Sequence, residues 1–172
     1  MLEEFYYFSH PVVYSSCENS KIQVKNKTTT IITRSADQTE SAGEAFASQV
    51  KSGDIICLYG ELGAGKTTFV RGFVRGLGFE DRVMSPTFTI IRTYHKNGDR
   101  ELRCYHIDLY RIEDGKSNVQ SLGIEDIFAD KNAIVLIEWP ERMKELLPEK
   151  RWDVIFNVTG DSERLVKYIN NE

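Results

Sequence analysis

The sequence has few cysteines, no long apolar run and no excess of positive charge. Its three cysteines, Cys17, Cys57 and Cys104, are scattered and lack metal-ligand spacing, so we expect buried thiols in a reducing cytosol rather than disulfides or a zinc site. The longest apolar runs are far too short to span a bilayer, which predicts no membrane partner. The first residues include neither a basic region nor a long apolar one, so we expect no secretory signal and a cytoplasmic location.

The balance of charges argues against one class of function. Lys and Arg number 22 and Asp and Glu number 26, which gives a net charge of −4 and a pI of about 5.5. A protein that binds nucleic acid through a broad surface of its own is usually basic, because it must neutralise phosphates. The charge therefore argues against a broad nucleic-acid surface on this chain, and does not exclude a role on RNA through a partner.

Residues 1–27 differ in composition from the rest of the chain. They combine a polar tract with aromatic residues that follow no helical or strand period: Phe5, Tyr6, Tyr7, Phe8 and Tyr14. We expect a flexible N-terminal extension here. The alternative is a partner-binding or self-association arm, since aromatic side chains are good interface anchors. The remaining residues, 28–172, suffice for a single domain with its own core.

The most informative stretch is an apolar run, Ile55–Tyr59, that leads into a phosphate-loop pattern ending in Gly65, Lys66 and Thr67. Glycines allow positive φ, successive N–H groups form an anion nest, and the following helix adds the positive end of its dipole. Lys66 would reach the outer phosphates of a nucleotide, and the Thr67 hydroxyl would bind a bridging Mg²⁺. The predicted nucleotide-binding residues of the loop are Gly63, Ala64, Gly65, Lys66, Thr67 and Thr68.

Strand-like and helix-like segments alternate along the chain. The predicted strands are 28–33, 55–59, 89–94, 102–107, 133–137, 152–158 and 164–169. The predicted helices run from an N-cap at Ser35 to Ser52-Gly53, from the phosphate loop to Gly76–Gly78, and over 124–128 and 141–147. Hairpin turns are expected at Asn97-Gly98 and Gly160-Asp161. We expect a three-layer α/β domain of the P-loop NTPase-like type, with a mainly parallel central sheet and antiparallel hairpin additions.

Phosphoryl chemistry with Mg²⁺ needs a carboxylate near the phosphate loop. Glu138 follows the apolar run 134–137 and is the predicted metal carboxylate; the alternative is an ordinary strand-end acid. Asp108 also follows an apolar strand, and could bind the metal through water or position the attacking water. Thr87 could close on the γ-phosphate as switch threonines do, or be a turn hydroxyl. Together with Lys66, these three are the predicted catalytic residues.

Three neighbouring residues allow both structural and functional interpretations. His106 is a lone histidine, for which a hydrogen-bonded structural role is favoured over catalysis. Trp139 could belong to the core or form a lid beside the nucleotide. Arg111 could pair with a nearby acid or serve a partner surface.

Four motifs taken together resemble the TsaE family, formerly called YjeE, the bacterial P-loop ATPases of tRNA threonylcarbamoyladenosine synthesis. The resemblance covers about Thr28 to Lys167, most of the chain. The phosphate loop alone is not specific to this family, whereas the four motifs in this order are. They are Gly60-Glu61-Leu62-Gly63-Ala64-Gly65-Lys66-Thr67-Thr68, Ser85-Pro86-Thr87-Phe88-Thr89, His106-Ile107-Asp108-Leu109-Tyr110-Arg111 and Ile137-Glu138-Trp139-Pro140-Glu141.

The resemblance implies a small cytoplasmic ATPase that uses ATP and Mg²⁺ and acts with the TsaD–TsaB heterodimer. In this family the heterodimer transfers a threonylcarbamoyl group to adenosine 37 of tRNA, so the chain would meet tRNA only indirectly, through the complex. ATP hydrolysis would then reset the complex between turnovers. Family members generally lack a segment like residues 1–27.

Motif matching also implies roles for individual residues. Thr67 and Glu138 correspond to metal-binding positions, and Lys66 to the phosphate lysine. Thr87 and Asp108 correspond to positions needed for hydrolysis. Two further matches, Thr39 before the loop and Arg164 in the final hairpin, resemble positions near the nucleotide.

Two other functions remain open from the sequence. A small-molecule kinase would share the loop, but usually carries an arginine-rich lid, whereas the arginines here are dispersed from Arg71 to Arg111. A nucleotide-sensing scaffold without enzymatic activity is the second alternative. A GTPase is not expected, because the sequence has neither an Asn/Thr-Lys-x-Asp guanine motif nor an Asp-x-x-Gly switch.

Overall fold

The computed structural model describes residues 26–79, 83–96, 99–112 and 122–171, so the predicted extension lies outside it except for its last two residues. The elements, in chain order, are β1 (Asn26–Thr33), α1 (Ala36–Ala47), β2 (Ile55–Tyr59), α2 (Lys66–Gly76), β3 (Ile91–Lys96), β4 (Asp99–Asp108), α4 (Ile124–Ala129), β5 (Ala133–Glu138), the 3₁₀ helix η1 (Pro140–Leu146), β6 (Arg151–Val158) and β7 (Arg164–Asn171).

The strands form one sheet of seven in the order β1-β7-β6-β2-β5-β4-β3. The central strands β6, β2, β5 and β4 are parallel to one another, while β3 pairs antiparallel with β4, and β7 antiparallel with β6 and β1. The predicted mainly parallel centre with hairpin additions is therefore confirmed. Carboxyl ends of parallel strands meet at one edge of a sheet, which is where open α/β folds bind ligands.

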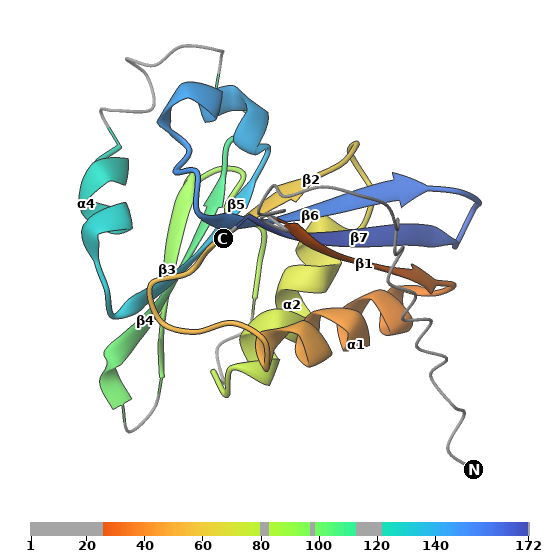
Figure 1. The fold of residues 1–172 in the computed structure, drawn as a ribbon, viewed down its shortest axis with the longest axis horizontal. Helices are drawn as coiled ribbons and strands as arrows, with labels where there is room; N and C mark the ends of the chain where they lie inside the picture. Colours follow the sequence, from red (N-terminus) through yellow and green to blue (C-terminus); the bar gives the residue numbers. More distant parts are fainter. Residues whose placement is uncertain (1–25, 80–82, 97–98, 113–121, 172) are drawn as a thin grey trace, which may run out of the picture.

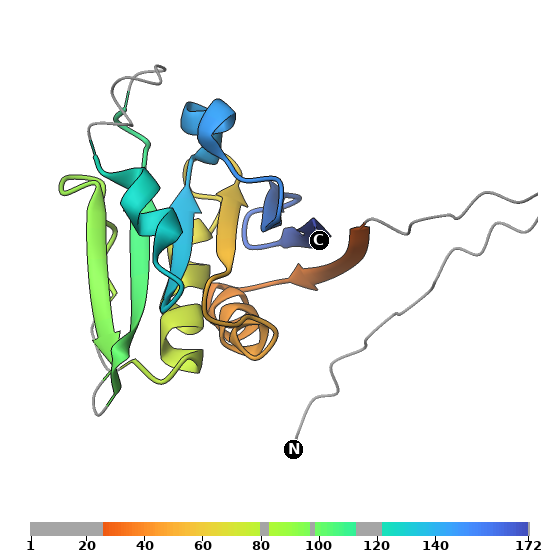
Figure 2. The same cartoon turned by 60° about the vertical axis from the view of Figure 1, so that its left-hand side comes forward.

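Figures 1 and 2 show the sheet with the helices packed around it. The sheet separates two hydrophobic cores. Successive residues of β5 alternate between them: Ile134 and Leu136 face α1 and α2, whereas Val135 and Ile137 face α4 and η1. Burial on both faces explains why β2 and β5 read as continuous apolar runs rather than as alternating strands. Helices on both sides of the sheet give the predicted three layers. None of the helices in the described part of the chain is long and apolar enough to cross a membrane.

Helices α1 and α2 touch backbone to backbone through glycines. A Cβ atom built on Gly72 of α2 would lie 1.7 Å from the carbonyl oxygen of Glu40, and one on Gly43 of α1 would lie 2.1 Å from that of Phe69. No side chain larger than hydrogen fits either position unless the helices move apart. Arg75 adds ion pairs from α2 to Glu40 and Glu44 of α1 on the exposed side of this contact.

Gly72→Ala should therefore destabilise the fold although alanine is the better helix former. We expect a loss of about 1–3 kcal/mol in the free energy of unfolding, the usual cost of overpacking, and a lower midpoint in thermal unfolding. Gly160→Ala is the matched control, because its Cβ would meet only the Glu163 Cβ at an ordinary 3.5 Å. Equal melting temperatures for the two variants would contradict the close contact.

Two helix predictions need correction. The first helix ends at Ala47, not at Ser52-Gly53, because the Ser48 hydroxyl and N–H both bond back to the Ala45 carbonyl and tight turns follow. Val50 still packs against the core after the helix has ended, so the apolar spacing continues beyond it. The predicted helix 141–147 is present, but as a 3₁₀ helix kinked at Met143.

Candidate functional site

The phosphate loop joins β2 to α2 in the conformation that its glycines allow. Gly60, Gly63 and Gly65 have φ of 147°, 79° and 103°, values that other residues rarely adopt. A Cβ on Gly60 would lie 2.8 Å from the Phe156 carbonyl oxygen, so this glycine is also needed for space. The loop ends on the first turn of α2, whose N–H groups have no partners within the helix. This arrangement suits an anion.

Lys66 is buried beneath the loop with its ammonium group held by protein atoms. Nζ donates to the carbonyl oxygens of Gly60, at 2.5 Å, and Glu61, at 3.1 Å, and lies 4.0 Å from the centre of the Trp139 ring. Burial lowers the pKa of Lys66, and the nearby carboxylate of Glu138 opposes that shift. An anion bound in the loop would add to this opposing effect and favour the charged lysine.

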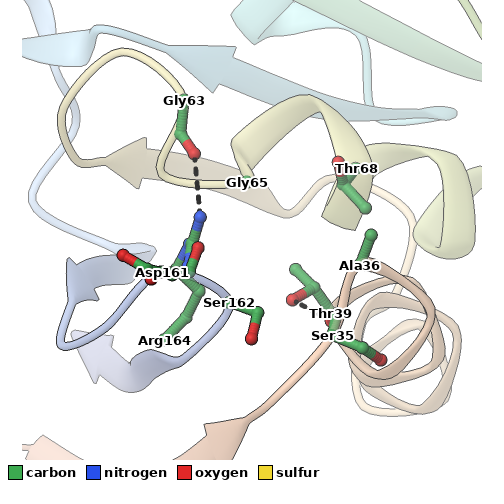
Figure 3. A pocket seen from close by; sticks show the side chains of 9 residues that line it. All are labelled: Ser35, Ala36, Thr39, Gly63, Gly65, Thr68, Asp161, Ser162 and Arg164. Carbon is green, nitrogen blue, oxygen red and sulfur yellow. Dashed lines mark hydrogen bonds between the residues drawn. The ribbon is translucent and has the colours of Figure 1, made fainter.

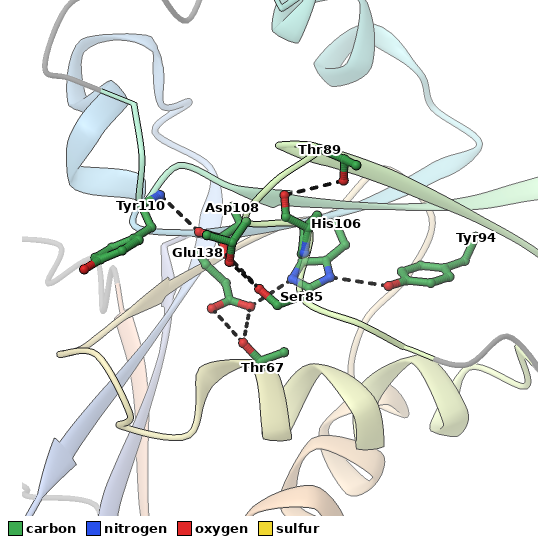
Figure 4. A network of polar contacts seen from close by, with 10 residues as sticks. Thr67, Ser85, Thr89, Tyr94, His106, Asp108, Tyr110 and Glu138 are labelled. Carbon is green, nitrogen blue, oxygen red and sulfur yellow. Dashed lines mark hydrogen bonds and ion pairs between the residues drawn. The ribbon is translucent and has the colours of Figure 1, made fainter.

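Glu138 lies at the carboxyl end of β5, next to Asp108 at the end of β4 in the parallel register. Its side chain points toward α2, where the Thr67 hydroxyl lies 2.9 and 3.1 Å from its two carboxylate oxygens (Figure 4). On its other side the His106 Nε2 lies 2.9 Å from Oε1. Because a carboxylate only accepts, His106 donates from Nε2 and orients Glu138.

Asp108 gathers hydroxyl groups from the segment that connects α2 to β3. Its Oδ2 accepts from Thr87 at 2.6 Å and from Ser85 at 3.0 Å, and its Oδ1 accepts from the Tyr110 N–H at 3.0 Å. The Ser85 and Thr87 hydroxyls also lie 2.6 Å apart. Asp108 and Glu138 are each only 3% exposed, so two carboxylates are buried side by side, each satisfied by hydroxyl or imidazole donors.

Backbone strain is found next to both of these carboxylates. In the described residues, only Ile90 and Trp139 among non-glycine residues have positive φ, at 64° and 61°. Trp139 directly follows Glu138, and the Ile90 carbonyl accepts the Asp108 N–H at 2.9 Å. Such conformations cluster at ligand sites because the surrounding structure must enforce them. The turn at Trp139 places its ring over Lys66 and 5.1 Å from the Tyr110 ring.

A pocket of about 210 Å³ opens on the other side of the phosphate loop (Figure 3). Its walls come from three places, the start of α1, the phosphate loop with α2, and the turn between β6 and β7: Ser35, Ala36, Thr39, Gly63, Gly65, Thr68, Asp161, Ser162 and Arg164. Arg164 donates to the Gly63 carbonyl at 3.5 Å and to carbonyls of its own turn, so it links that turn to the loop. Thr39 is 3% exposed and bonds to Thr33 and to the Ser35 carbonyl.

The structure brings together every residue predicted for the site, in two groups. Lys66, Thr67 and Glu138 meet at the start of α2, with Asp108 beside Glu138 in the register and Thr87 bonded to Asp108, while the pocket collects Thr39, Gly63, Gly65, Thr68 and Arg164. Ala64, in the phosphate loop, is buried.

Sequence reasoning missed several residues of the same site. His106 was expected to have a hydrogen-bond partner, but the sequence did not indicate that this partner is Glu138. Ser85 is part of one of the four motifs, but no contact was predicted for it, and it bonds to Asp108. Asp161 and Ser162 follow a hairpin signal, and nothing in their spacing indicates that the turn reaches the phosphate loop.

The carboxylates are too few to form a complete metal site from protein alone. In the described part of the chain, no group of three or more His, Cys, Asp or Glu side chains could hold a metal ion. Oxygen atoms of Thr67 and Glu138 nevertheless meet beside the phosphate loop. A hard cation there would complete its shell with phosphate oxygens and water, which is how Mg²⁺ usually binds in such sites.

The chain is similar to proteins of one family. The family model described as "Threonylcarbamoyl adenosine biosynthesis protein TsaE" matches residues 33–166. The protein called tRNA threonylcarbamoyladenosine biosynthesis protein TsaE in Bacillus subtilis is 39% identical over 132 residues, which cover 77% of this chain and 79% of that protein. Its counterpart in Treponema pallidum is 33% identical over 133 residues, covering 77% and 94%. The crystal structure of Bacillus subtilis YdiB has a TM-score of 0.70 at 33% identity, covering 86% of this chain and 88% of that one.

Proposed function

Because the chain belongs to the TsaE family of threonylcarbamoyl adenosine biosynthesis proteins, we propose that it is the Mg²⁺-dependent, ATP-hydrolysing component of the machinery that modifies adenosine 37 of tRNA. In this proposal it is a cytoplasmic protein that acts with the TsaD–TsaB heterodimer and meets tRNA through that complex. It does not perform the threonylcarbamoyl transfer itself.

One observation carries the ATPase part of the proposal. A phosphate loop and its lysine lie beside a hydroxyl–carboxylate pair, Thr67 and Glu138, and the neighbouring strand end carries a second carboxylate with its own hydroxyl groups. These are the parts that phosphoryl transfer to water requires: an anion cradle, a cation site and groups that can orient the attacking water. A structural ion-pair network would not need a glycine-lined loop beside it.

The pocket between α1 and the β6–β7 turn supports an assignment for the rest of the nucleotide. With the phosphates over the start of α2, the sugar and base would extend toward Thr39, Ser162 and Arg164. The walls are short hydroxyl side chains and backbone, with Asp161 and Arg164 at the turn. An ion pair from Arg34 to Glu163, at 3.3 Å between exposed side chains, connects the same turn to the segment before α1.

Thr67 and Glu138 fit a Mg²⁺ site, since both present oxygen atoms beside the loop and His106 fixes the carboxylate from behind. The cation, when bound, would neutralise charge on the β- and γ-phosphates. Lys66 would leave the Gly60 and Glu61 carbonyls and donate to the outer phosphates. Those carbonyl contacts keep the buried ammonium group solvated by protein until then.

Asp108 and Thr87 support the hydrolytic step in this proposal. The Thr87 hydroxyl already donates to Asp108, so the pair could hold a water molecule between them by a small movement of the connecting segment. Neither residue lies on the phosphate-loop helix. Their placement can therefore change without disturbing nucleotide binding, as a partner-dependent step requires.

Reconstituted tRNA modification tests the function directly. TsaD–TsaB and the enzyme that supplies the threonylcarbamoyl group should support repeated modification cycles only when this chain and ATP are present. Thr87→Ala and Asp108→Asn should bind ATP but slow hydrolysis about 100-fold, as expected when a group that handles the attacking water is lost. Modification should then stop after the first cycle.

Asp126→Asn, on the exposed side of α4, is the matched control and should support modification as the wild type does. Repeated cycles without the chain would remove it from the machinery. Phosphate transfer from ATP to a small molecule, with no effect on tRNA, would instead identify a kinase.

A further inference from the structure

Large apolar side chains that remain exposed are concentrated around the candidate site. Of the six such residues in the described part of the chain, four belong to segments that build the site: Leu62, Met84, Phe88 and Tyr110. The other two, Ile32 and Val158, are on β1 and β6. Single exposed apolar residues need no explanation, but several around one functional region indicate an interaction surface.

Phe88 is the most exposed of these residues, with 82% of its surface accessible. The guanidinium of Arg111 stacks on its ring at 4.2 Å from the ring centre. This stacking holds two flexible side chains in one orientation before any partner arrives, which lowers the entropy lost on binding. An aromatic ring and an arginine are also the residues most often found at the energetic centre of protein interfaces.

The Phe88–Arg111 pair lies on the outside of the two segments whose inner residues form the site. Phe88 directly follows Thr87, and Arg111 comes three residues after Asp108. The hydrogen bond from Thr87 to Asp108 and the stacking of Arg111 on Phe88 therefore connect the same two segments. Ile90, at its unusual φ of 64°, ends the first segment. A partner that pulls on the exposed pair would therefore shift Thr87 relative to Asp108.

We propose that Phe88 and Arg111 are the anchor of a docking surface for a partner protein, which offers an apolar pocket for the ring and a carboxylate for the guanidinium. Tyr110, the residue before Arg111, extends this surface toward the phosphate loop, because its ring lies 5.1 Å from that of Trp139, which covers Lys66. Arginine with an exposed ring also suits single-stranded RNA, but the net charge of −4 disfavours RNA as a direct ligand. A protein partner needs no such excess of positive charge.

This inference rests on the proposed function, because it assigns the surface through which TsaD–TsaB would reach Thr87 and Asp108. The inference specifies which residues of this chain the heterodimer would contact, and how that contact would affect the residues that handle water. Contact at Phe88 and Arg111 would act on the groups that handle water, while the nucleotide pocket, which lies beyond the phosphate loop, would be left unchanged.

The test compares Phe88→Ser and Arg111→Glu with Ile32→Ser, an exposed apolar residue on β1 at the opposite edge of the sheet. Binding of each full-length variant to immobilised TsaD–TsaB is measured with ATP and Mg²⁺, along with ATP binding and hydrolysis by the isolated chain. Phe88→Ser and Arg111→Glu should weaken heterodimer binding by about 30-fold or more, the size of a hot-spot truncation. ATP binding and hydrolysis in isolation should be unchanged, as should heterodimer binding by Ile32→Ser.

The outcomes separate this inference from the function on which it rests. If the wild type binds the heterodimer and Phe88→Ser binds equally well, the docking surface is overturned and the function stands. If the wild type does not bind, the proposed function fails, and this inference with it. If the chain binds tRNA in the absence of the heterodimer and this binding depends on Phe88, the proposal that the surface binds a protein is also overturned. Circular dichroism and melting temperature verify that each variant is folded.

Discussion

Lys66→Ala is expected to abolish ATP hydrolysis and to weaken ATP binding. Lys66 is the buried cation of the phosphate loop, and its ammonium group lies within reach of the anion site at the start of α2. Losing a hydrogen bond to a charged group costs about 1.5–3 kcal/mol, or about 10- to 150-fold in affinity. Turnover should fall further, by about 1,000-fold, because the developing charge on the transferred phosphate loses a fixed donor. Steady-state phosphate release and equilibrium ATP titration measure the two effects.

Arg71→Ala on the same helix is the control, since it removes an exposed cation without touching the loop. Burial already lowers the pKa of Lys66, so the site gains by having an anion beside it. The lysine should therefore contribute more to binding than an exposed lysine would. Normal turnover by a folded Lys66→Ala protein would show that hydrolysis takes place elsewhere.

Glu138→Gln is expected to reduce turnover by about 100-fold or more while the nucleotide still binds. The amide keeps the shape of the side chain and its contact with Thr67, but lacks the charge that a hard cation prefers. Mg²⁺ titrations of the hydrolysis rate should show that the variant needs a much higher concentration of cation. The His106 contact should survive as a hydrogen bond to the amide oxygen.

Glu141→Gln makes the same chemical change three residues further along, at an exposed position. Its rate should depend on Mg²⁺ as that of the wild type does. If Glu138→Gln also titrates like the wild type, Asp108 becomes the better candidate for the metal carboxylate. This outcome is physically reasonable, because Asp108 is its neighbour in the parallel register.

The centre of the fold could be predicted because its causes are local. Ile55–Tyr59 forms β2 as expected, since a short apolar run followed by a glycine-rich loop is typical of a buried strand. Helix α2 ends at Gly76, where the predicted glycines begin. Glu138 could be placed beside the loop because carboxyl ends of adjacent parallel strands share one edge. The strand order around that edge follows from the same packing.

The rest depends on contacts between distant segments, which no local pattern records. His106 reads as a core histidine, and only the pairing of β4 with β5 places it against Glu138. The turn at Asp161 lines a pocket because β6 lies beside β2, which aligns its end with the phosphate loop. The glycines at 43 and 72 appear unremarkable in helices until α1 and α2 are seen in contact.

The close contact of α1 with α2 makes one part of the site more rigid than the other. Two helices joined backbone to backbone cannot slide without opening a void, so α1, α2 and the loop that separates β2 from α2 move as a rigid body. That body holds Thr39 and the phosphate loop. Displacement must then fall on residues 83–90 and the end of β4, where strain is already present at Ile90. If the loop holds ATP as proposed, residues 83–90 and the end of β4 are therefore the part of the site that can respond to the loss of the γ-phosphate, while the part that holds the nucleotide stays fixed.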